Sequence, residues 1–311
     1  MFEPRHSGDD RPKTARAARS GRRSGSPRSF PAIIALITGG MFVWSTPATT
    51  ATPGSPGSPG SPGSPGSTAA APGTPTAATH GTNSNCEDAK PTIVGTERND
   101  IIVGTPGNDV IFALGGNDTV YALGGNGRIC GGPGNDILRG DEDNDQISGD
   151  SGDDQLIGGL GNDDLRGRSG NDDLRGEPGN DRISGDSGDD QLIGGLGNDD
   201  LRGRSGNDDL HGGRGSDQLD GGEDNDDLHG DEENDTLYGD TGDDTLSGGK
   251  GNDELRGGRG NDRLDGEEDN DRLFGEAGDD ALDGGRGTNT NNGGSGTNSC
   301  INPRNGPGCN D

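Results

Sequence analysis

Aspartate recurs every nine residues through most of this chain, and this spacing carries the clearest chemical information in the sequence. Nine-residue units counted from Gly95 run to Asn292 without an insertion or deletion, which gives 22 units, and Asp occupies the sixth position in 20 of them. Gly127 and Asn289 are the two exceptions. No counter-charge is fixed within the unit. Carboxylates held at one phase of a strict period indicate a repeated set of oxygen ligands for a hard cation.

The candidate metal ligands are the aspartates at the sixth position. They are Asp100, Asp109, Asp118, Asp136, Asp145, Asp154, Asp163, Asp172, Asp181, Asp190, Asp199, Asp208, Asp217, Asp226, Asp235, Asp244, Asp253, Asp262, Asp271 and Asp280.

The element that must position these carboxylates is a short strand joined to a Gly-rich turn. Position eight is Ile, Val or Leu in 21 of the 22 units, with Asn291 the exception. One aliphatic residue in nine is too few for an amphipathic helix, and each glycine would cost such a helix about 1 kcal/mol. We therefore expect positions seven to nine to form a strand with position eight pointing inward. Positions one to six are expected to form the turn, with Gly at positions one and four allowing positive φ and Asn at position five tolerating the left-handed region.

Two such units make one 18-residue coil, so 22 units predict an all-β solenoid of 11 stacked coils. Stacking would place successive turn carboxylates about 5 Å apart, the spacing of neighbouring strands, where their charges repel. Calcium between the turns resolves this repulsion, because it accepts six to eight oxygens in flexible geometry, whereas magnesium requires a tighter octahedron. Two columns of 11 turns leave ten gaps each, which sets an upper limit of about 20 calcium ions.

Composition and charge favour an extracellular cation-binding protein over other classes. The chain has 311 residues, of which only 23% are hydrophobic and 65 are Gly, so without the period it would be classed as disordered. Residues 95–292 hold 50 Asp and Glu against 16 Lys and Arg, a net charge of −34. Such a surface repels nucleic acid and anionic membranes and attracts cations.

The order of segments predicts four parts. Residues 1–51 combine a long basic region with a short apolar run and a small-residue exit, which is typical of an export signal. The run of about 15 apolar residues is short for a membrane span, which needs about 20, so we expect a cleaved signal and no stable span, with an uncleaved anchor as the alternative. Residues 52–85 predict a disordered Pro/Gly/Ser-rich spacer, residues 86–292 the roll, and residues 293–311 a Gly/Asn-rich tail.

The four cysteines are expected to form two disulfides in an exported chain. None of Cys86, Cys130, Cys300 and Cys309 belongs to a Cys-x-x-Cys pair, so a zinc ribbon or redox motif is not indicated. We favour Cys300 with Cys309, closing a short loop, and Cys86 with Cys130 at the start of the repeats. The other connectivities remain open.

The nine-residue units resemble a known family. Residues 158–166 and 248–256 match the pattern Gly-Gly-x-Gly-x-Asp-x-aliphatic-x throughout, which resembles the RTX-type, or hemolysin-type, calcium-binding nonapeptide. The resemblance implies a right-handed parallel β-roll in which the turn Asp and turn carbonyls bind calcium between coils, and which folds when calcium is met after export. Units one to four match less well and are interpreted as an N-terminal cap with fewer ions. Acidic residues at position four, such as Asp143 and Glu233, are expected to perturb their turns or add a ligand.

Two histidines share a phase of the repeat. His211 and His229 both occupy position nine and lie 18 residues apart, so they are expected to stack on adjacent coils. Two exposed histidines on a polar strand is the preferred interpretation, and a weak transition-metal site is the alternative.

The function predicted from these observations is a secreted or cell-surface calcium-binding protein without catalytic activity. The sequence contains no Ser/His/Asp set, no His-Glu-x-x-His motif and no segment outside the repeats long enough for a catalytic domain. The alternative is a cell-surface adhesin, or a scaffold of a matrix or biofilm, that uses the calcium-stiffened roll as a stalk. Its surface or matrix partner is not identified by the sequence.

Overall fold

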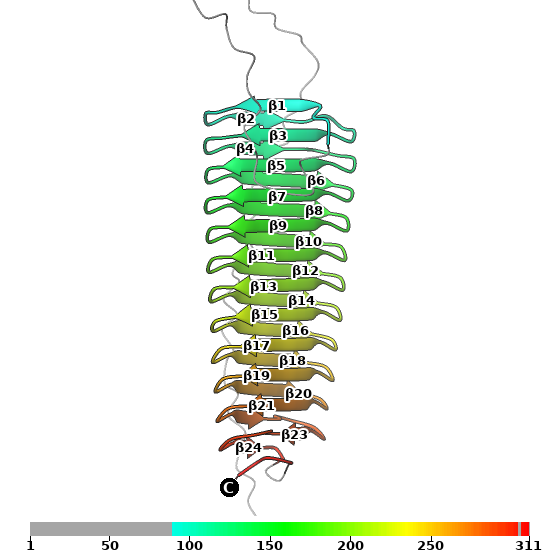
Figure 1. Cartoon of the computed structure of the whole chain (residues 1–311). Helices are drawn as coiled ribbons and strands as arrows, with labels where there is room; N and C mark the ends of the chain where they lie inside the picture. Colours follow the sequence, from blue (N-terminus) through cyan, green and yellow to red (C-terminus); the bar gives the residue numbers. More distant parts are fainter. Residues whose placement is uncertain (1–88, 304–305, 311) are drawn as a thin grey trace, which may run out of the picture. The chain divides into compact units, whose positions relative to one another are not determined.

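The computed structural model describes residues 89–303 and 306–310, and these form a β-solenoid built from two parallel sheets (Figure 1). Each sheet has 12 strands, and successive strands of the chain alternate between the two sheets. The expected export signal, the spacer and Cys86 lie outside the described residues. No helix in the described part of the chain is long and apolar enough to cross a membrane.

The first sheet contains the odd-numbered strands, in chain order. They are β1 (Ile93–Thr96), β3 (Val110–Leu114), β5 (Arg128–Pro133), β7 (Gln146–Ser151), β9 (Asp164–Ser169), β11 (Arg182–Ser187), β13 (Asp200–Ser205), β15 (Gln218–Glu223), β17 (Thr236–Thr241), β19 (Glu254–Arg259), β21 (Arg272–Ala277) and β23 (Thr290–Asn292).

The second sheet contains the even-numbered strands, again in chain order. They are β2 (Ile101–Val103), β4 (Thr119–Tyr121), β6 (Ile137–Glu142), β8 (Gln155–Leu160), β10 (Asp173–Pro178), β12 (Gln191–Leu196), β14 (Asp209–Arg214), β16 (Asp227–Glu232), β18 (Thr245–Lys250), β20 (Arg263–Glu268), β22 (Ala281–Asp283) and β24 (Ser299–Ile301).

The strand is longer than the sequence predicted and the turn is shorter. In β9 the strand runs through positions seven, eight and nine and continues through positions one, two and three of the next unit. Burial alternates along it, so that Leu165 at position eight and Gly167 at position one both face inward. Only positions four to six remain as the turn. The prediction of a six-residue turn was wrong because glycine at position one continues the pleat rather than breaking it.

Positive φ angles fall at positions two and four. Position four was expected, whereas positions one and five were expected but do not show them. Within β9 and its turn, Arg168 at position two has φ 89° and Gly170 at position four has φ 133°. No position-five Asn or Asp of the described repeats has a positive φ. Glycine at position one is needed for close approach instead, because a Cβ on Gly167 would collide with Asp172 Oδ2 and with the carbonyl oxygen of Gly185.

The core is a double column of aliphatic side chains. The 18-residue register pairs position eight with position eight, as in Leu165 with Ile183 in one sheet and Leu174 with Leu192 in the other. From Ile111 to Leu282 these side chains are at most 1% exposed. The inward-facing aliphatic predicted from the period is therefore confirmed, and the narrow interior holds no aromatic side chain among the described residues.

The roll has 12 coils rather than the 11 expected, because one further strand is present at each end. β1 begins at Ile93, before the first counted unit, and β24 follows Asn292 and pairs with β22, placing Cys300 opposite Leu282. Residues 293–301 are a unit in which Asn298 replaces the Asp and Cys300 replaces the aliphatic residue. The sequence predicted a tail here rather than a further unit, because both residues that define a unit are changed.

The C-terminal disulfide closes this last coil. Cys300 and Cys309 are bonded with an S–S distance of 2.01 Å, as expected from the short loop between them. Cys130 is also disulfide-bonded. Its expected partner, Cys86, is outside the described residues, so that pairing stays a prediction.

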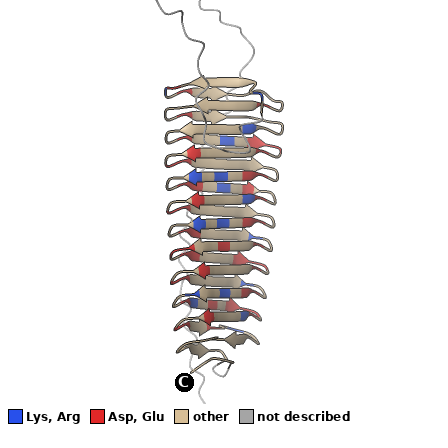
Figure 2. Ribbon diagram, viewed as in Figure 1, with Lys and Arg blue, Asp and Glu red and all other residues tan. Residues whose placement is uncertain are grey.

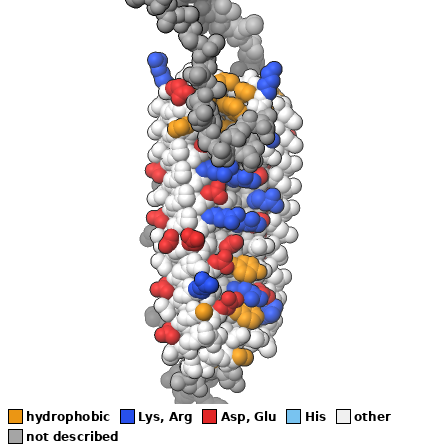
Figure 3. Space-filling model, viewed as in Figure 1, with side chains coloured by type: hydrophobic (Ala, Val, Ile, Leu, Met, Phe, Trp, Pro, Cys, Tyr) orange, Lys and Arg blue, Asp and Glu red, His pale blue; other side chains and the backbone are white. Residues whose placement is uncertain are grey.

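Residues of both charge signs are interspersed along the strands (Figure 2), and on the face in Figure 3 their side chains lie among uncharged ones. Arginine at position nine pairs with an acid two residues earlier, as in Arg202 Nη2 with Asp200 Oδ2 at 2.9 Å and Arg256 Nη2 with Glu254 Oε1 at 2.6 Å. Pairs at such partly exposed positions contribute about 0–1 kcal/mol each. They neutralise the faces locally and leave the turns as the most acidic part of the roll.

Candidate metal centre

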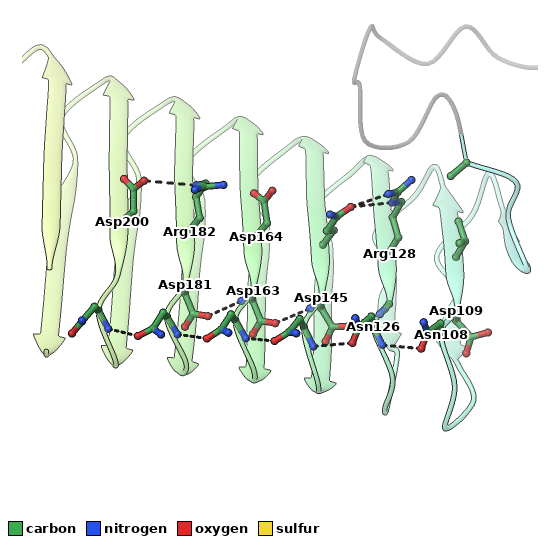
Figure 4. Close-up of a pocket in the computed structure, with 18 of the residues that line it drawn as sticks. Asn108, Asp109, Asn126, Arg128, Asp145, Asp163, Asp164, Asp181, Arg182 and Asp200 are labelled. Atoms are coloured by element: carbon green, nitrogen blue, oxygen red, sulfur yellow. Dashed lines mark hydrogen bonds and ion pairs between the residues drawn. The ribbon is translucent and has the colours of Figure 1, made fainter. Parts of the chain in front are cut away.

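The turn aspartates form two continuous columns along the edges of the roll. Each Oδ1 accepts a hydrogen bond from the backbone N–H of the residue 18 positions earlier, as Asp163 Oδ1 does from Asp145 and Asp181 Oδ1 from Asp163, both at 2.8 Å (Figure 4). The same bond repeats from Asp118 to Asp280 at 2.6–3.0 Å. The carboxylates therefore hold neighbouring turns in register.

A second column at position five runs in the opposite direction. The backbone N–H of Asn162 donates to Asn144 Oδ1 at 2.6 Å, and that of Asn180 donates to Asn162 Oδ1 at 2.7 Å. Asp153 accepts in the same way from Asn171 at 3.0 Å. Sequence reasoning missed this role, although the restriction of position five to Asn or Asp was its signal. The residue is selected for a side-chain acceptor rather than for a left-handed backbone.

The other carboxylate oxygen, Oδ2, is buried without a hydrogen-bond donor in 18 of the 20 candidate aspartates. In the unit of Asp172, Oδ2 and the carbonyl oxygen of Gly185 on the next coil both face the space beside Gly167. These groups are all acceptors. A buried carboxylate oxygen without a donor is costly, and a cation that contacts several oxygens removes that cost. The donor set therefore fits calcium.

The cost of burying these carboxylates is expressed in their pKa values. Burial, opposed by the hydrogen bond to Oδ1 and reinforced by neighbouring aspartates, raises the pKa of Asp154, Asp226 and Asp235 to about 8. Burial likewise raises the pKa of Asp163 to about 6 and that of Asp181 to about 7. Without a cation, the folded turns thus favour protonated aspartates.

Asparagine at position six shows what surrounds the Oδ2 site. Asn298 Nδ2 donates to the carbonyl oxygen of Gly293 at 2.7 Å, and Asn289 Nδ2 donates to the carbonyl oxygen of Gly284. Both asparagines keep the Oδ1 bond, to Asp280 and Asp271 respectively. An N–H group satisfies the turn carbonyl by itself, so the last turn of each column needs no cation.

At the other end, threonine takes the place of a cation. Thr105 donates to Asp109 Oδ2 through its backbone N–H at 2.6 Å and its hydroxyl at 2.8 Å. Burial raises the pKa of Asp109, but these bonds and one from Thr92 outweigh it and lower the pKa below its usual value. Thr96 makes the same two contacts with Asp100. Threonine at position two of the first two units was the signal in the sequence.

The acidic side chains of Asp143 and Glu233 at position four bond to the preceding coil rather than to the Oδ2 sites. Asp143 Oδ2 accepts the N–H of Gly125 at 3.1 Å, and Glu233 Oε2 accepts that of Gly215 at 3.0 Å. Both residues have positive φ, 72° and 79°. These bonds connect each turn to the turn of the preceding coil. The two acidic residues therefore replace glycine at position four without adding a metal site to the column.

Replacing a mid-column aspartate tests this assignment. In Asp181→Asn the new Nδ2 would donate to the carbonyl of Gly176, as Asn298 does with Gly293, so we expect the fold to persist while one or two calcium ions are lost. Asp109→Asn is the matched control, because Asp109 Oδ2 is already occupied by Thr105. Equilibrium dialysis with atomic absorption gives the ion count. Equal loss from both variants would contradict the assignment.

This arrangement defines a class of protein, a parallel solenoid with acidic turn columns suited to calcium. Comparison with known families agrees: the RTX calcium-binding nonapeptide repeat matches residues 94–129, 131–165, 166–201, 202–237, 229–264, 238–273, 256–290 and 265–299. These matches span well over half of the chain. The chain belongs to the RTX calcium-binding nonapeptide repeat family and is a calcium-binding repeat protein.

Comparison with solved structures found a similar chain described as a hyperactive, Ca²⁺-dependent, β-helical antifreeze protein from an Antarctic bacterium. It is 21% identical, with a TM-score of 0.33, over 66% of this chain and 84% of that one. Comparison with curated proteins gave no match.

Proposed function

We propose that this chain is a secreted, non-catalytic protein whose roll folds when calcium fills the gaps between stacked turns. The observation that carries the proposal is the set of 18 buried Oδ2 atoms that have no donor, several of which lie beside a carbonyl oxygen of the next coil. Supplying a cation to these oxygens converts a repulsive column into a bonded one, so the free energy of binding becomes free energy of folding.

The columns also suggest how many ions bind. The aspartates that precede the odd-numbered strands form an unbroken column from Asp145 to Asp271. Gly127 interrupts this column before Asp145, and Asn289 ends it after Asp271. The column before the even strands runs from Asp118 to Asp280. Counting only gaps that have an unpaired Oδ2 on both turns gives seven and nine. We therefore propose about 16 calcium ions, fewer than the 20 allowed by counting repeats.

Secretion belongs to the same proposal. A roll that needs calcium would remain unfolded where free calcium is scarce and fold where it is abundant, which suits a chain exported before folding. The basic and apolar residues before position 52 support export by their composition. The interior of the roll is filled by aliphatic side chains, and its outer faces pair their arginines with acids, which supports a non-catalytic role.

Calcium titration of the metal-free chain, followed by far-UV circular dichroism, tests the proposal. We expect a disordered spectrum without calcium, a cooperative gain of β signal as calcium is added, and little change with magnesium, which binds poorly to flexible carbonyl-rich sites. A β signal that is the same with and without a chelator at neutral pH would refute calcium-driven folding.

A further inference from the structure

The outer face of the even-numbered sheet holds a pair of directly stacked histidines. His211 on β14 and His229 on β16 are register partners, and their rings are stacked with centroids 4.6 Å apart and planes 8° from parallel. Both side chains are about one-third exposed, 36% and 34%. The stacking expected from the sequence is therefore confirmed, and the two rings share one surface.

Each histidine also has a carboxylate on the same side of its ring. His211 Nε2 lies 3.1 Å from Asp209 Oδ1, and His229 Nε2 lies 3.1 Å from Asp227 Oδ1. Asp209 and Asp227 are themselves register partners. Two histidines, each with its own carboxylate neighbour, thus lie side by side on two adjacent strands.

The separation of these donors is close to that of a metal site. Ligand atoms of Asp209, His211 and His229 all lie within 4.8 Å of one another. Two nitrogens bound to one zinc ion, at about 2.0–2.1 Å each, lie at most about 4.2 Å apart. Small rotations of partly exposed side chains are enough to close the difference.

A further carboxylate is placed to orient one of the rings. Asp231 Oδ2 lies 3.6 Å from His211 Nδ1, on the side of the ring away from Asp209. A carboxylate that accepts the Nδ1 proton fixes the tautomer in which Nε2 is free to bind a metal. The histidine pair therefore has ligands on one side and an orienting group on the other.

The rest of the repeat shows that this stacking is exceptional. Arginine at position nine makes the same contact with an acid at position seven, as Arg175 does with Asp173 at 2.9 Å. Yet no two position-nine arginines lie on adjacent strands of one sheet, and Ile157 and Ile193 flank Arg175 on either side. Ile193 and Ser247 flank the histidine pair in the same way, so neither neighbouring coil places a cation at position nine beside it.

We propose that His211, His229 and Asp209 bind one transition-metal dication of the zinc type, on the outside of the roll and away from both calcium columns. Imidazole nitrogens with carboxylate oxygens are suited to zinc or copper, whereas calcium takes oxygen ligands. The ion would link two neighbouring coils and neutralise the carboxylate of Asp209. It would bind the unprotonated Nε2 of each neutral imidazole together with a carboxylate oxygen.

Isothermal titration of zinc chloride into the calcium-saturated full-length chain tests this site. We expect one zinc equivalent in the native chain and at least a tenfold loss of affinity in His211→Ser and in His229→Ser, because serine already occupies position nine in several units. Arg175→Ser, which removes a position-nine side chain two coils away from His211, is the matched control and should bind zinc as the native chain does.

Circular dichroism in calcium separates loss of the fold from loss of the site, so a failure of the calcium proposal would be seen independently. The proton NMR signals of the two imidazoles should shift together on adding zinc to the native chain. The proposal is overturned if the folded native chain takes up no zinc, or if the double variant His211→Ser/His229→Ser retains the native affinity.

Discussion

Without calcium, the chain is expected to gain β-structure on acidification to about pH 4 and to lose it as the pH rises toward about 8. The mid-column aspartates carry this effect: burial raises the pKa of 16 of them from 3.8 to between about 6 and about 8. A proton on Oδ2 can donate to the nearby carbonyl oxygen, as the amide of Asn298 does.

The sign follows from proton binding. Between about pH 4 and 8 the folded state binds more protons than the unfolded state, so the free energy of unfolding falls as the pH rises through this window. The loss of folding stability is absent below the pKa that the aspartates have in the unfolded chain. It is complete above the pKa that they have in the folded chain. Because 16 groups are shifted in the same direction, even a small penalty at each one is large in total beside the roughly 5–15 kcal/mol that stabilises a typical domain.

Circular dichroism of metal-free protein across this pH range measures the effect, and calcium at neutral pH is expected to restore the lost signal. General repulsion between surface carboxylates would act in the same direction. About 0.5 M NaCl distinguishes the two, because salt screens exposed charges far more than buried ones. A metal-free spectrum that is independent of pH, or a pH effect abolished by salt, would argue against the buried aspartates as its source.

The second large effect is expected from a polar substitution in the middle of the core. In Leu201→Asn the new amide would enter a column where Leu201 is 0% exposed and both register neighbours, Ile183 and Leu219, are aliphatic. A cavity in a core costs about 2–5 kcal/mol, and a buried polar group without partners adds about 1–3 kcal/mol. Because each coil contacts only its neighbours, the roll should open at this point.

Hydrogen exchange in calcium, read by mass spectrometry, measures this opening. We expect loss of protection centred on β13 in Leu201→Asn and little change in the matched variant Arg202→Ser, which removes a partly exposed side chain from the same strand. Asn291 shows when such a residue is tolerated: it is buried, but its Nδ2 donates to the carbonyls of Ile301 and Pro303. Equal protection in both variants would mean that the coils do not depend on the continuity of the aliphatic column.

The sequence predicted most of this architecture because its period places each residue type at one phase. Leu165 was expected to face inward and Asp163 to lie in a turn, and both do. The terminal units were harder to read, since their defining residues are replaced by Asn291, Asn298 and Cys300. There the side-chain amides of Asn291 and Asn298 donate to backbone carbonyl oxygens, and these contacts cannot be read from the period.

The nine-residue period also could not predict the backbone φ angles or the hydrogen bonds between coils. A side chain such as Arg168 at φ 89° is not expected in a strand, because positive φ is strained for residues other than glycine. The same positive φ recurs at position two of other units, where it is carried by glycine in some, such as Gly159 and Gly213. The column of Asn acceptors at position five exists only once the 18-residue register is known, since each bond joins residues of different coils.

The 18-residue coil restricts how the roll can gain or lose residues. Residues 149–174 and 185–210 are identical, and the offset of 36 residues is two complete coils. Inserting or removing whole coils returns every later strand to its own sheet, so His211 and His229 keep their shared face and Cys300 keeps its place. Removing a single nine-residue unit would exchange the two sheets for all later strands, leaving the core intact but moving every outer side chain to the opposite face. The fold therefore tolerates changes in steps of nine residues, whereas the pattern on its surface tolerates them only in steps of 18.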